Sequence, residues 1–338
     1  MPWSKVVQFD DPLACQAALQ SAAEAEMLPT AKGTFHVEAT QIGMNTLRLQ
    51  RFHVVLPQIG TFTVAADRRS IGFLVEENAS DMTHCGLQVT PADLLVHAHD
   101  AVHQRSGPDF RYATMSLPED EISVLGRAVI GQHFLLESFG AITRPAPDLM
   151  SRLKKLHKVV GQLAHDTPEL LELPEVRRSL EEQLAHVMVR CLAEGAGDKT
   201  TVGDSRHDAI VAKFEDFLAD HPDQPLYLTE ICTSIHVAER TLRAVCEEHL
   251  GMGPIRFLTL RRMHLVRSAL LAADTGTTSV TRVATDFGFW ELGRFSVAYR
   301  ALFGESPSET LRRSADQSKS SLNRPSSLST NLISFSQN

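Results

Sequence analysis

Two stretches in the last third of the chain repeat one pattern, in which a short helix, a tight turn and a longer amphipathic helix follow each other. The first is LTEICTSIHVAERTLRAVCEEH (228–249), and the second is VTRVATDFGFWELGRFSVAYRALF (280–303). In the second copy Gly288 stands where the chain has to turn, because glycine adopts the left-handed backbone that ends a helix without strain. The pattern predicts two helix-turn-helix units, in each of which the second helix can enter a major groove of DNA.

Each helix of the second copy has its apolar residues at helical spacing, which predicts one buried face per helix. The expected buried residues are Val280, Val283, Ala284 and Phe287 in the first helix, and Phe295, Ala298, Tyr299 and Phe303 in the second.

The charge is divided unevenly over the 338 residues, which are enough for two or three domains. The formal net charge is −8, and residues 1–225 hold 20 Lys and Arg against 31 Asp and Glu. Residues 226–316 hold 11 basic residues, all of them arginine, against 10 acidic ones. Arginine suits bidentate contacts with phosphates and guanine edges. A nearly neutral DNA-binding domain beside an acidic partner domain is therefore expected.

The first part of the chain has a different character. Residues 34–118 contain short runs rich in β-branched and aromatic residues, separated by Gly, Pro, Asn and Asp, which predicts a small β-sandwich or barrel. Residues 1–30 are expected to form a short helical lead. Helical spacing begins at Glu119 and predicts a short helix over 119–129.

Two longer helices, over 148–166 and from Pro174 to about Glu194, form a predicted antiparallel pair. Their apolar stripes, which include Leu180 and Leu184, allow packing on the strand domain and dimerisation, and the two are compatible. Residues 195–205 are rich in Gly and Thr and predict a linker, while the Ser-rich residues 314–338 predict a disordered tail.

Three segments near the C-terminus carry a family resemblance. ERTLRAVCEEHLGMGP (239–254), IRFLTLRRMHLVRSALL (255–271) and VATDFGFWELGRFSVAYRALFGESPSETLRR (283–313) resemble the AraC/XylS-type transcription regulators. The resemblance implies two helix-turn-helix units, bridged by one long helix, that read successive major grooves. It also implies an N-terminal cupin-like β-domain that binds a small effector, with which the strand pattern of 34–118 agrees.

The first unit departs from the family pattern. His236 stands where the turn glycine is usual, and Tyr227 and Ala238 stand at helix N-caps where Ser or Thr is usual. Cys246 replaces the usual core phenylalanine. Because each lost cap costs about 1 kcal/mol, the first unit is expected to be less stable than the second.

The two recognition helices, about 238–249 and 291–303, provide the candidate DNA contacts. These are Arg240, Arg243, Ala244, Glu291, Gly293, Arg294, Val297 and Arg300, while Leu242 and Val245 face inward. Arg294 is the candidate for a guanine contact, and Glu291 accepts from cytosine or pairs with Arg294. The other arginines are expected to contact phosphates or form surface ion pairs; they are Arg261, Arg262, Arg267, Arg312 and Arg313.

The predicted effector contacts on the strands are Arg48, Gln50, Phe52 and Phe73. A histidine group formed by His84, His97, His99 and His103 suggests a cupin-type metal site, but the glutamate that such a site needs is absent. We therefore expect polar or effector-contacting histidines and no metal. The alternative is a metal-dependent cupin-type enzyme fused to a DNA-binding domain.

Enzyme motifs such as GxGxxG, GxSxG and HExxH are missing, and the five scattered cysteines do not suit an alkyl-acceptor repair protein. The predicted fold class is multidomain α+β, with the domains 1–147 (sensing), 148–194 (dimerising), 195–205, 206–313 (DNA-binding) and 314–338. The predicted function is a ligand-responsive, sequence-specific regulator of transcription that needs no cofactor. Its expected partners are operator DNA, a small effector, RNA polymerase and a second copy of the chain. The absence of an apolar leader or membrane span predicts a cytoplasmic protein.

Overall fold

The computed structural model describes residues 3–20, 25–62, 67–76, 81–97, 102–131, 141–194, 200–201, 206–221, 224–274 and 277–313. The predicted tail 314–338, and the predicted linker apart from residues 200–201, lie outside these ranges. The chain divides into two compact units, residues 1–261 and residues 262–338. No helix of the described residues is long and apolar enough to cross a membrane.

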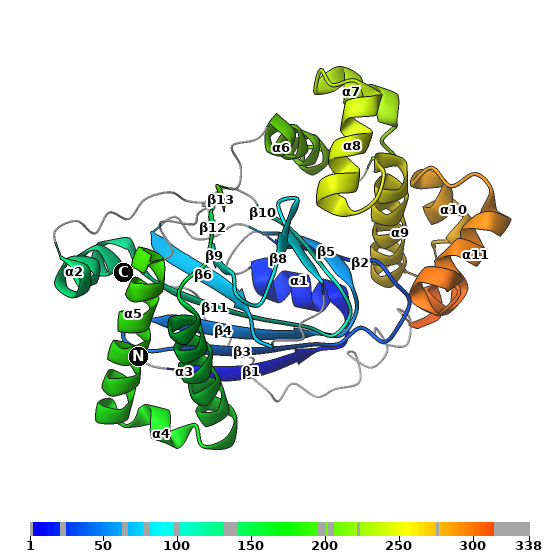
Figure 1. Ribbon diagram of the computed structural model, residues 1–338. Helices are drawn as coiled ribbons and strands as arrows, with labels where there is room; N and C mark the ends of the chain where they lie inside the picture. Colours follow the sequence, from blue (N-terminus) through cyan, green and yellow to red (C-terminus); the bar gives the residue numbers. More distant parts are fainter. Residues whose placement is uncertain are drawn as a thin grey trace, which may run out of the picture. The chain divides into compact units, whose positions relative to one another are not determined.

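Two antiparallel sheets form the centre of the first unit (Figure 1). The larger sheet is sheet A. Its strands lie side by side in the order β1 (Trp3–Phe9), β3 (Val37–Gly43), β4 (Arg48–Val54), β11 (Phe110–Pro118), β6 (Arg68–Leu74), β9 (Leu94–Val96), β12 (Ala141–Thr143) and β13 (Thr200–Thr201). In sheet B the order is β2 (Ala25–Pro29), β5 (Gln58–Phe62), β10 (Val102–Ser106), β7 (Met82–His84) and β8 (Leu87–Val89). The predicted β-sandwich is therefore confirmed.

The prediction of a helical lead over residues 1–30 is wrong at both ends. Among the described residues of this stretch only α1 (Pro12–Gln20) is helical, while β1 pairs with β3 from Trp3 opposite Gly43 to Phe9 opposite Val37. Strand β2 pairs with β5 in the same way. Both pairings join segments distant in sequence, so tertiary contacts override the local helical spacing of the alanines and leucines.

One face of sheet A is covered by helices α2 (Glu119–Ile130), α3 (Pro147–Asp166), α4 (Glu169–Glu172) and α5 (Pro174–Glu194). Their apolar residues share one core with this face, and the core includes Leu49, Phe73 and Met115 of the sheet. Leu184 is fully buried in this core, and Leu180 packs against it. The apolar stripe of α5 therefore packs within its own chain, so Leu184 cannot form a dimer interface.

The other face of sheet A meets sheet B. The core between the sheets holds Val54, Leu74 and Tyr112 of sheet A together with Met27 and Met82 of sheet B. The outer face of sheet B shares a core with residues of the helices α6 (Arg206–Ala219), α7 (Leu228–Ser234) and α8 (Glu239–Leu250) and with the start of α9 (Pro254–Ala272). Leu28 and Ile59 of that outer face share a core with these helices.

The second unit contains α10 (Val280–Asp286), α11 (Leu292–Phe303) and a final helical segment at residues 307–313. Val283, Ala284, Phe295 and Tyr299 are buried in its core as predicted. Ala298 is exposed, contrary to the prediction. It lies at the edge of the stripe centred on Phe295 and Tyr299, where no described element covers it.

Candidate nucleic-acid interface

The turn between α10 and α11 has the geometry of a helix-turn-helix. Gly288 has a φ of +78°, which glycine adopts without strain. The N-cap Ser279 starts α10, because its hydroxyl accepts a hydrogen bond from the Arg282 backbone N–H at 3.2 Å. Gly304 ends α11 at a φ of +79°. Both ends of the helix pair are thus fixed by local sequence.

The outward face of α11 carries the predicted contacts of the second unit. Gly293, Arg294 and Arg300 are exposed, as is Glu291 at the N-cap. Val297 is 73% exposed and points away from the stripe of Phe295 and Tyr299. Arg294 Nη1 lies 2.9 Å from Glu291 Oε2, so Glu291 pairs with Arg294 in the free protein. Trp290 precedes α11, is 71% exposed and was not among the predicted contacts.

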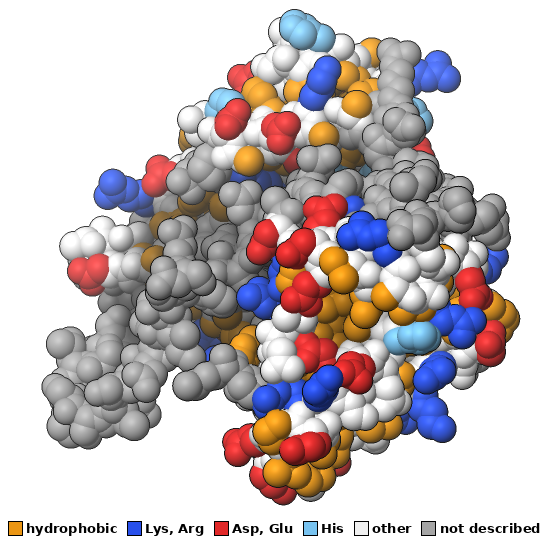
Figure 2. All heavy atoms as spheres, turned by 90° about the vertical axis from the view of Figure 1, so that its left-hand side faces the viewer, with side chains coloured by type: hydrophobic (Ala, Val, Ile, Leu, Met, Phe, Trp, Pro, Cys, Tyr) orange, Lys and Arg blue, Asp and Glu red, His pale blue; other side chains and the backbone are white. Residues whose placement is uncertain are grey.

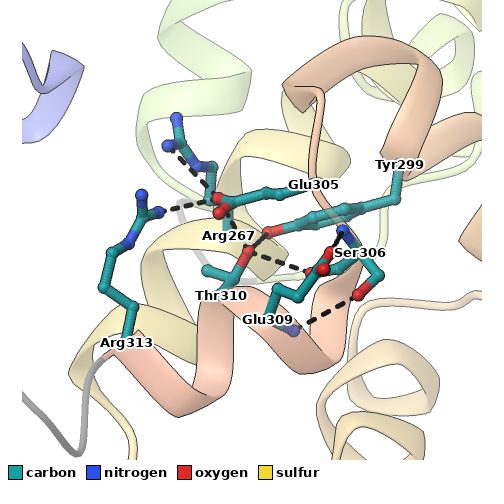
Figure 3. Close-up of polar contacts among 7 residues, drawn as sticks. All are labelled: Arg267, Tyr299, Glu305, Ser306, Glu309, Thr310 and Arg313. Atoms are coloured by element: carbon teal, nitrogen blue, oxygen red, sulfur yellow. Dashed lines mark hydrogen bonds and ion pairs between the residues drawn. The ribbon is translucent and has the colours of Figure 1, made fainter.

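Behind this face a polar network ties the final helical segment to α11 and α9 (Figure 3). The hydroxyls of Tyr299 and Thr310 are 2.9 Å apart, and the Thr310 hydroxyl donates to Glu305 Oε1 at 2.9 Å. Glu305 also pairs with Arg313 at 2.7 Å and Arg267 at 3.5 Å. These two arginines therefore form ion pairs within the unit, which is one of the two roles predicted for them.

The other arginines of this group also have partners within the chain. The guanidinium of Arg262 lies over the Phe289 ring at 5.2 Å from its centre, and Arg312 donates to the Ser308 carbonyl at 3.2 Å. Arg261 is buried, donates to the Leu218 carbonyl at 2.9 Å and lies 3.9 Å from Glu26. The predicted surface role is therefore wrong for Arg261, because sheet B covers this part of α9.

The first helix-turn-helix unit shows the irregularities expected from its sequence. His236 occupies the turn with a φ of +55°, a region that costs most residues other than glycine free energy. Ala238 caps α8 without a side-chain hydrogen bond, and Cys246 is buried in the core. At the start of α7 the Glu230 carboxylate accepts from the Tyr227 backbone N–H at 3.3 Å, which partly replaces the missing cap.

The predicted reading face of α8 is exposed. Arg240, Arg243 and Ala244 lie at the surface, while Leu242 and Val245 are fully buried. Arg243 pairs with Glu239 at 2.8 Å, one turn away on the same helix. Both units thus present an arginine paired with a nearby glutamate, and such exposed pairs are weak enough to open when DNA arrives.

A serine at position 238 is expected to stabilise the first helix-turn-helix. In Ala238→Ser the hydroxyl can accept from a free backbone N–H of the first turn of α8, which should raise the free energy of unfolding by about 1 kcal/mol. Ala244→Ser is the matched control, because an exposed serine inside the same helix should lower it by roughly 0.5 kcal/mol. Urea unfolding of both variants measures the difference. Equal effects would show that the N-cap of α8 is not under-stabilised.

Sheet B contacts α6, which packs beside the first helix-turn-helix, through polar groups as well as through the shared core. His103 Nδ1 on β10 lies 2.7 Å from Glu215 Oε1 on α6, and both side chains are largely buried. The Thr61 hydroxyl on β5 donates to the same carboxylate at 3.3 Å. Helix α6, which packs against α7 and α8 of the first helix-turn-helix, is therefore docked on the strand domain by a buried His103–Glu215 contact within an apolar core.

The predicted effector residues do not lie together. Gln50 and Phe52 alternate with core residues of β4 and face sheet B, on the same side as the exposed Arg48. Phe73 faces the helices instead, with its ring 5.3 Å from that of His157 on α3. The four residues therefore cannot line one pocket, because the strand pleat places Phe73 on the opposite side of sheet A.

The histidines of the predicted group are separated by sheet B. The rings of His84 and His97 lie 6.0 Å apart inside the sandwich, while His103 faces α6. His99 lies outside the described residues. Within the described residues no group of three or more His, Cys, Asp and Glu side chains could hold a metal ion.

Comparison with known proteins gives matches that include this region. A family model described as a helix-turn-helix domain matches residues 231–313. The probable thc operon regulatory protein of Rhodococcus erythropolis is 39% identical over 157 residues, which cover 46% of this chain and 47% of that protein. The XylDLEGF operon transcriptional activator 3 of Pseudomonas putida is 26% identical over 165 residues, covering 48% of this chain and 49% of that protein. The chain thus spans about half the length of these curated relatives.

Among solved structures, the AraC-like transcriptional activator CuxR covers 84% of this chain and 99% of its own, at 12% identity and a TM-score of 0.40. The sequence matches carry the assignment, because the matched family model includes α8, α10 and α11. Residues 231–313 therefore belong to the AraC/XylS family of helix-turn-helix transcription regulators.

Proposed function

We propose that this protein is a sequence-specific DNA-binding regulator of transcription that responds to a small effector. The observation that carries the proposal is the exposed face of α11, which holds Arg294 and Val297 on a family helix-turn-helix. An arginine near the start of a recognition helix can contact both acceptors of a guanine, and an apolar side chain can contact a thymine methyl. The relatives named as transcriptional activators support activation as the direction of control.

The ligand response is assigned to the first helix-turn-helix, because α6, which packs against α7 and α8, is docked on sheet B through His103 and Glu215. An effector that favours one arrangement of sheet B changes the position or mobility of α6 and α8. Such differential binding is the only way in which a ligand can shift the population of two states. In this proposal the domains are 1–147 for sensing, 148–194 for assembly and 206–313 for DNA binding.

The remaining partners follow from this function. A regulator of this kind is expected to work in the cytoplasm, and activation is expected to involve contact with RNA polymerase. The enzyme alternative has no support, because the matched relatives are named as regulators.

Selection of DNA from a random library tests the proposed function. The purified full chain is expected to enrich one sequence with two motifs about one helical turn apart, as two recognition helices on one DNA face require. The Arg294→Ala variant is the control, because it should lose enrichment at one position. Enrichment of no sequence above the random pool would contradict the proposal.

A homodimer is also part of the proposal, and because Leu184 is buried within its own chain, α4 is proposed as the interface in its place. Leu170 and Leu173 are exposed on either side of the buried Leu171. Figure 2 shows hydrophobic side chains among acidic ones at the lower end of the helical layer, where α4 lies in Figure 1. These side chains are available to a second copy of the chain, unlike the buried stripe of α5.

Sedimentation velocity tests this interface. The double variant Leu170→Glu/Leu173→Glu is expected to sediment as a monomer while the wild type sediments as a dimer, because four glutamates would meet across a two-fold axis. Val124→Glu, at a still more exposed apolar position on α2, is the control and should remain dimeric. A dimeric double variant with native circular dichroism would place the interface elsewhere.

A further inference from the structure

The inner face of sheet B carries polar side chains whose hydrogen-bonding atoms are buried. Gln58 on β5, Gln104 and Ser106 on β10, and His84 on β7 are register partners, so they point to one side of the sheet. Among the described residues, Gln58 Oε1, Gln104 Oε1, Ser106 Oγ and His84 Nδ1 have no hydrogen-bond partner. Buried polar atoms are nearly always paired, so four on one face indicate that something else pairs with them.

Sheet A presents a fixed polar group opposite this face. His97 Nε2 and the Tyr112 hydroxyl are 2.9 Å apart, and His97 Nδ1 is 3.0 Å from the Ser70 hydroxyl. Both ring nitrogens of His97 are therefore occupied, and the ring is held in one orientation. Gly72 is needed for this arrangement, because a Cβ at that position would lie 1.8 Å from the Tyr112 hydroxyl oxygen.

Aromatic and apolar groups complete the surroundings. The Phe62 ring lies edge-on to His97 at 5.9 Å, and the His84 ring lies 6.0 Å from His97. Met27 and Met82 of sheet B belong to the adjoining core. Polar atoms with free hydrogen-bonding capacity next to aromatic and thioether side chains are typical of small-molecule sites.

These histidines are neutral at pH 7. Burial lowers the pKa of His84 to about 3, with a further lowering from His97 and His103, and burial lowers the pKa of His97 to about 4. Gln104, Ser106, Tyr112 and Phe62 carry no charge either. A charged ligand would therefore be desolvated here without a counter-charge from these side chains, which is unfavourable.

We propose that His84, Gln104 and His97 form the effector site, and that the effector is an uncharged small molecule with a planar apolar body and a hydroxyl or amide group. The proposal rests on the proposed function, which it deepens by naming the site and the ligand class. The unpaired amide oxygens and the His84 nitrogen bind the polar group, while Phe62, Met27 and Met82 contact the apolar body.

The same strand connects this site with the DNA-binding helices. On β10, Gln104 faces the inside of the sandwich, and the next residue toward the N-terminus, His103, pairs with Glu215 of α6. Arg105 also faces outward, toward Gly251 at the end of α8. A ligand that moves Gln104 therefore moves the two residues that contact the first helix-turn-helix.

Thermal unfolding of the full chain tests the site with defined probes. Benzyl alcohol and benzamide are the neutral probes, and benzoate and benzylammonium are their charged counterparts. At saturating concentration at least one neutral probe is expected to raise the Tm by about 2–4 °C, with no rise for the charged pair. No rise with either neutral probe, or an equal rise with the ions, would overturn the proposed ligand class.

Variants locate the binding. His84→Phe and Gln104→Leu replace the unpaired polar groups with apolar ones and should abolish the rise while keeping the native circular dichroism spectrum. Gln183→Leu, on the exposed face of α5, is the matched control and should keep the rise in Tm. A rise that persists in both site variants would place the probe elsewhere. Since these measurements contain no DNA, they separate a wrong site from a failure of DNA selection, which would contradict the regulatory function itself.

Discussion

Replacing His103 by leucine is expected to lower the free energy of unfolding of the first unit by about 3–5 kcal/mol. The change leaves the Glu215 carboxylate largely buried against sheet B, where the Thr61 hydroxyl is its remaining partner from the strands. A largely buried carboxylate that has lost its main partner costs free energy, because it has been removed from water without full compensation. The His103–Glu215 pair therefore contributes to stability mainly because breaking it leaves the buried Glu215 carboxylate without its main partner.

A double-mutant cycle separates the pair from the surrounding packing. Glu215→Leu alone should cost less, because it leaves no buried carboxylate without its partner, and His103→Leu/Glu215→Leu should recover most of the loss. Urea unfolding followed by tryptophan fluorescence suits the measurement, since Trp3 lies in the first unit and Trp290 in the second. A cost below about 1 kcal/mol for His103→Leu would show that the ion pair does not hold the two elements together.

Arg294→Ala is expected to cost about 1–3 kcal/mol of operator binding and to relax base preference at a single position. The side chain is exposed near the start of α11 and pairs with Glu291, the exposed N-cap residue of that helix. Because such a pair is weak, little free energy is needed to turn the guanidinium from Glu291 to a guanine. The measurement is binding to a panel of singly substituted operators at several salt concentrations.

Two other arginines serve as comparisons. Arg300→Ala should weaken binding to all sequences alike and reduce the salt slope by about one unit, as expected for a phosphate contact near the end of the helix. Arg243→Ala should resemble Arg294→Ala with a smaller effect, because α8 lacks a side-chain cap and follows a strained turn at His236. A uniform loss across the panel for Arg294→Ala would make Arg294 a phosphate contact and refute the assigned reading face.

Local rules were sufficient where the chain folds on itself over short distances. The spacing around Gly288 predicted α10, α11 and the turn between them, and the prolines at 147 and 174 mark the starts of α3 and α5. Strands β1 and β2 were missed, because each is defined by a partner distant in the sequence. Whether Phe73 or Phe52 faces sheet B depends on which side the helices cover, and strand alternation alone does not decide that.

The residues of the proposed effector site were the hardest to predict for the same reason. His84, His97 and Gln104 come from three strands, and their juxtaposition depends on the order of both sheets. A histidine cluster in the sequence suggested a metal, yet the sheet places His103 on the opposite side from His84. The available signal was the alternation along β10, which puts His103 and Gln104 on opposite faces.

The core shared by Leu28, Ile59 and the helices α6 to α9 limits which segments can be exchanged between regulators of this kind in a chimera. A chimera joined at the boundary near residue 206 would separate Phe214 from the two strand residues in its core, and the exposed apolar surface would favour aggregation. A recombined chain keeps its solubility only if the outward-facing residues of sheet B and the helices that pack on them come from the same parent protein. The sequences of strands β2, β5 and β10 are therefore expected to change together with those of α6 and α8 as such proteins diverge.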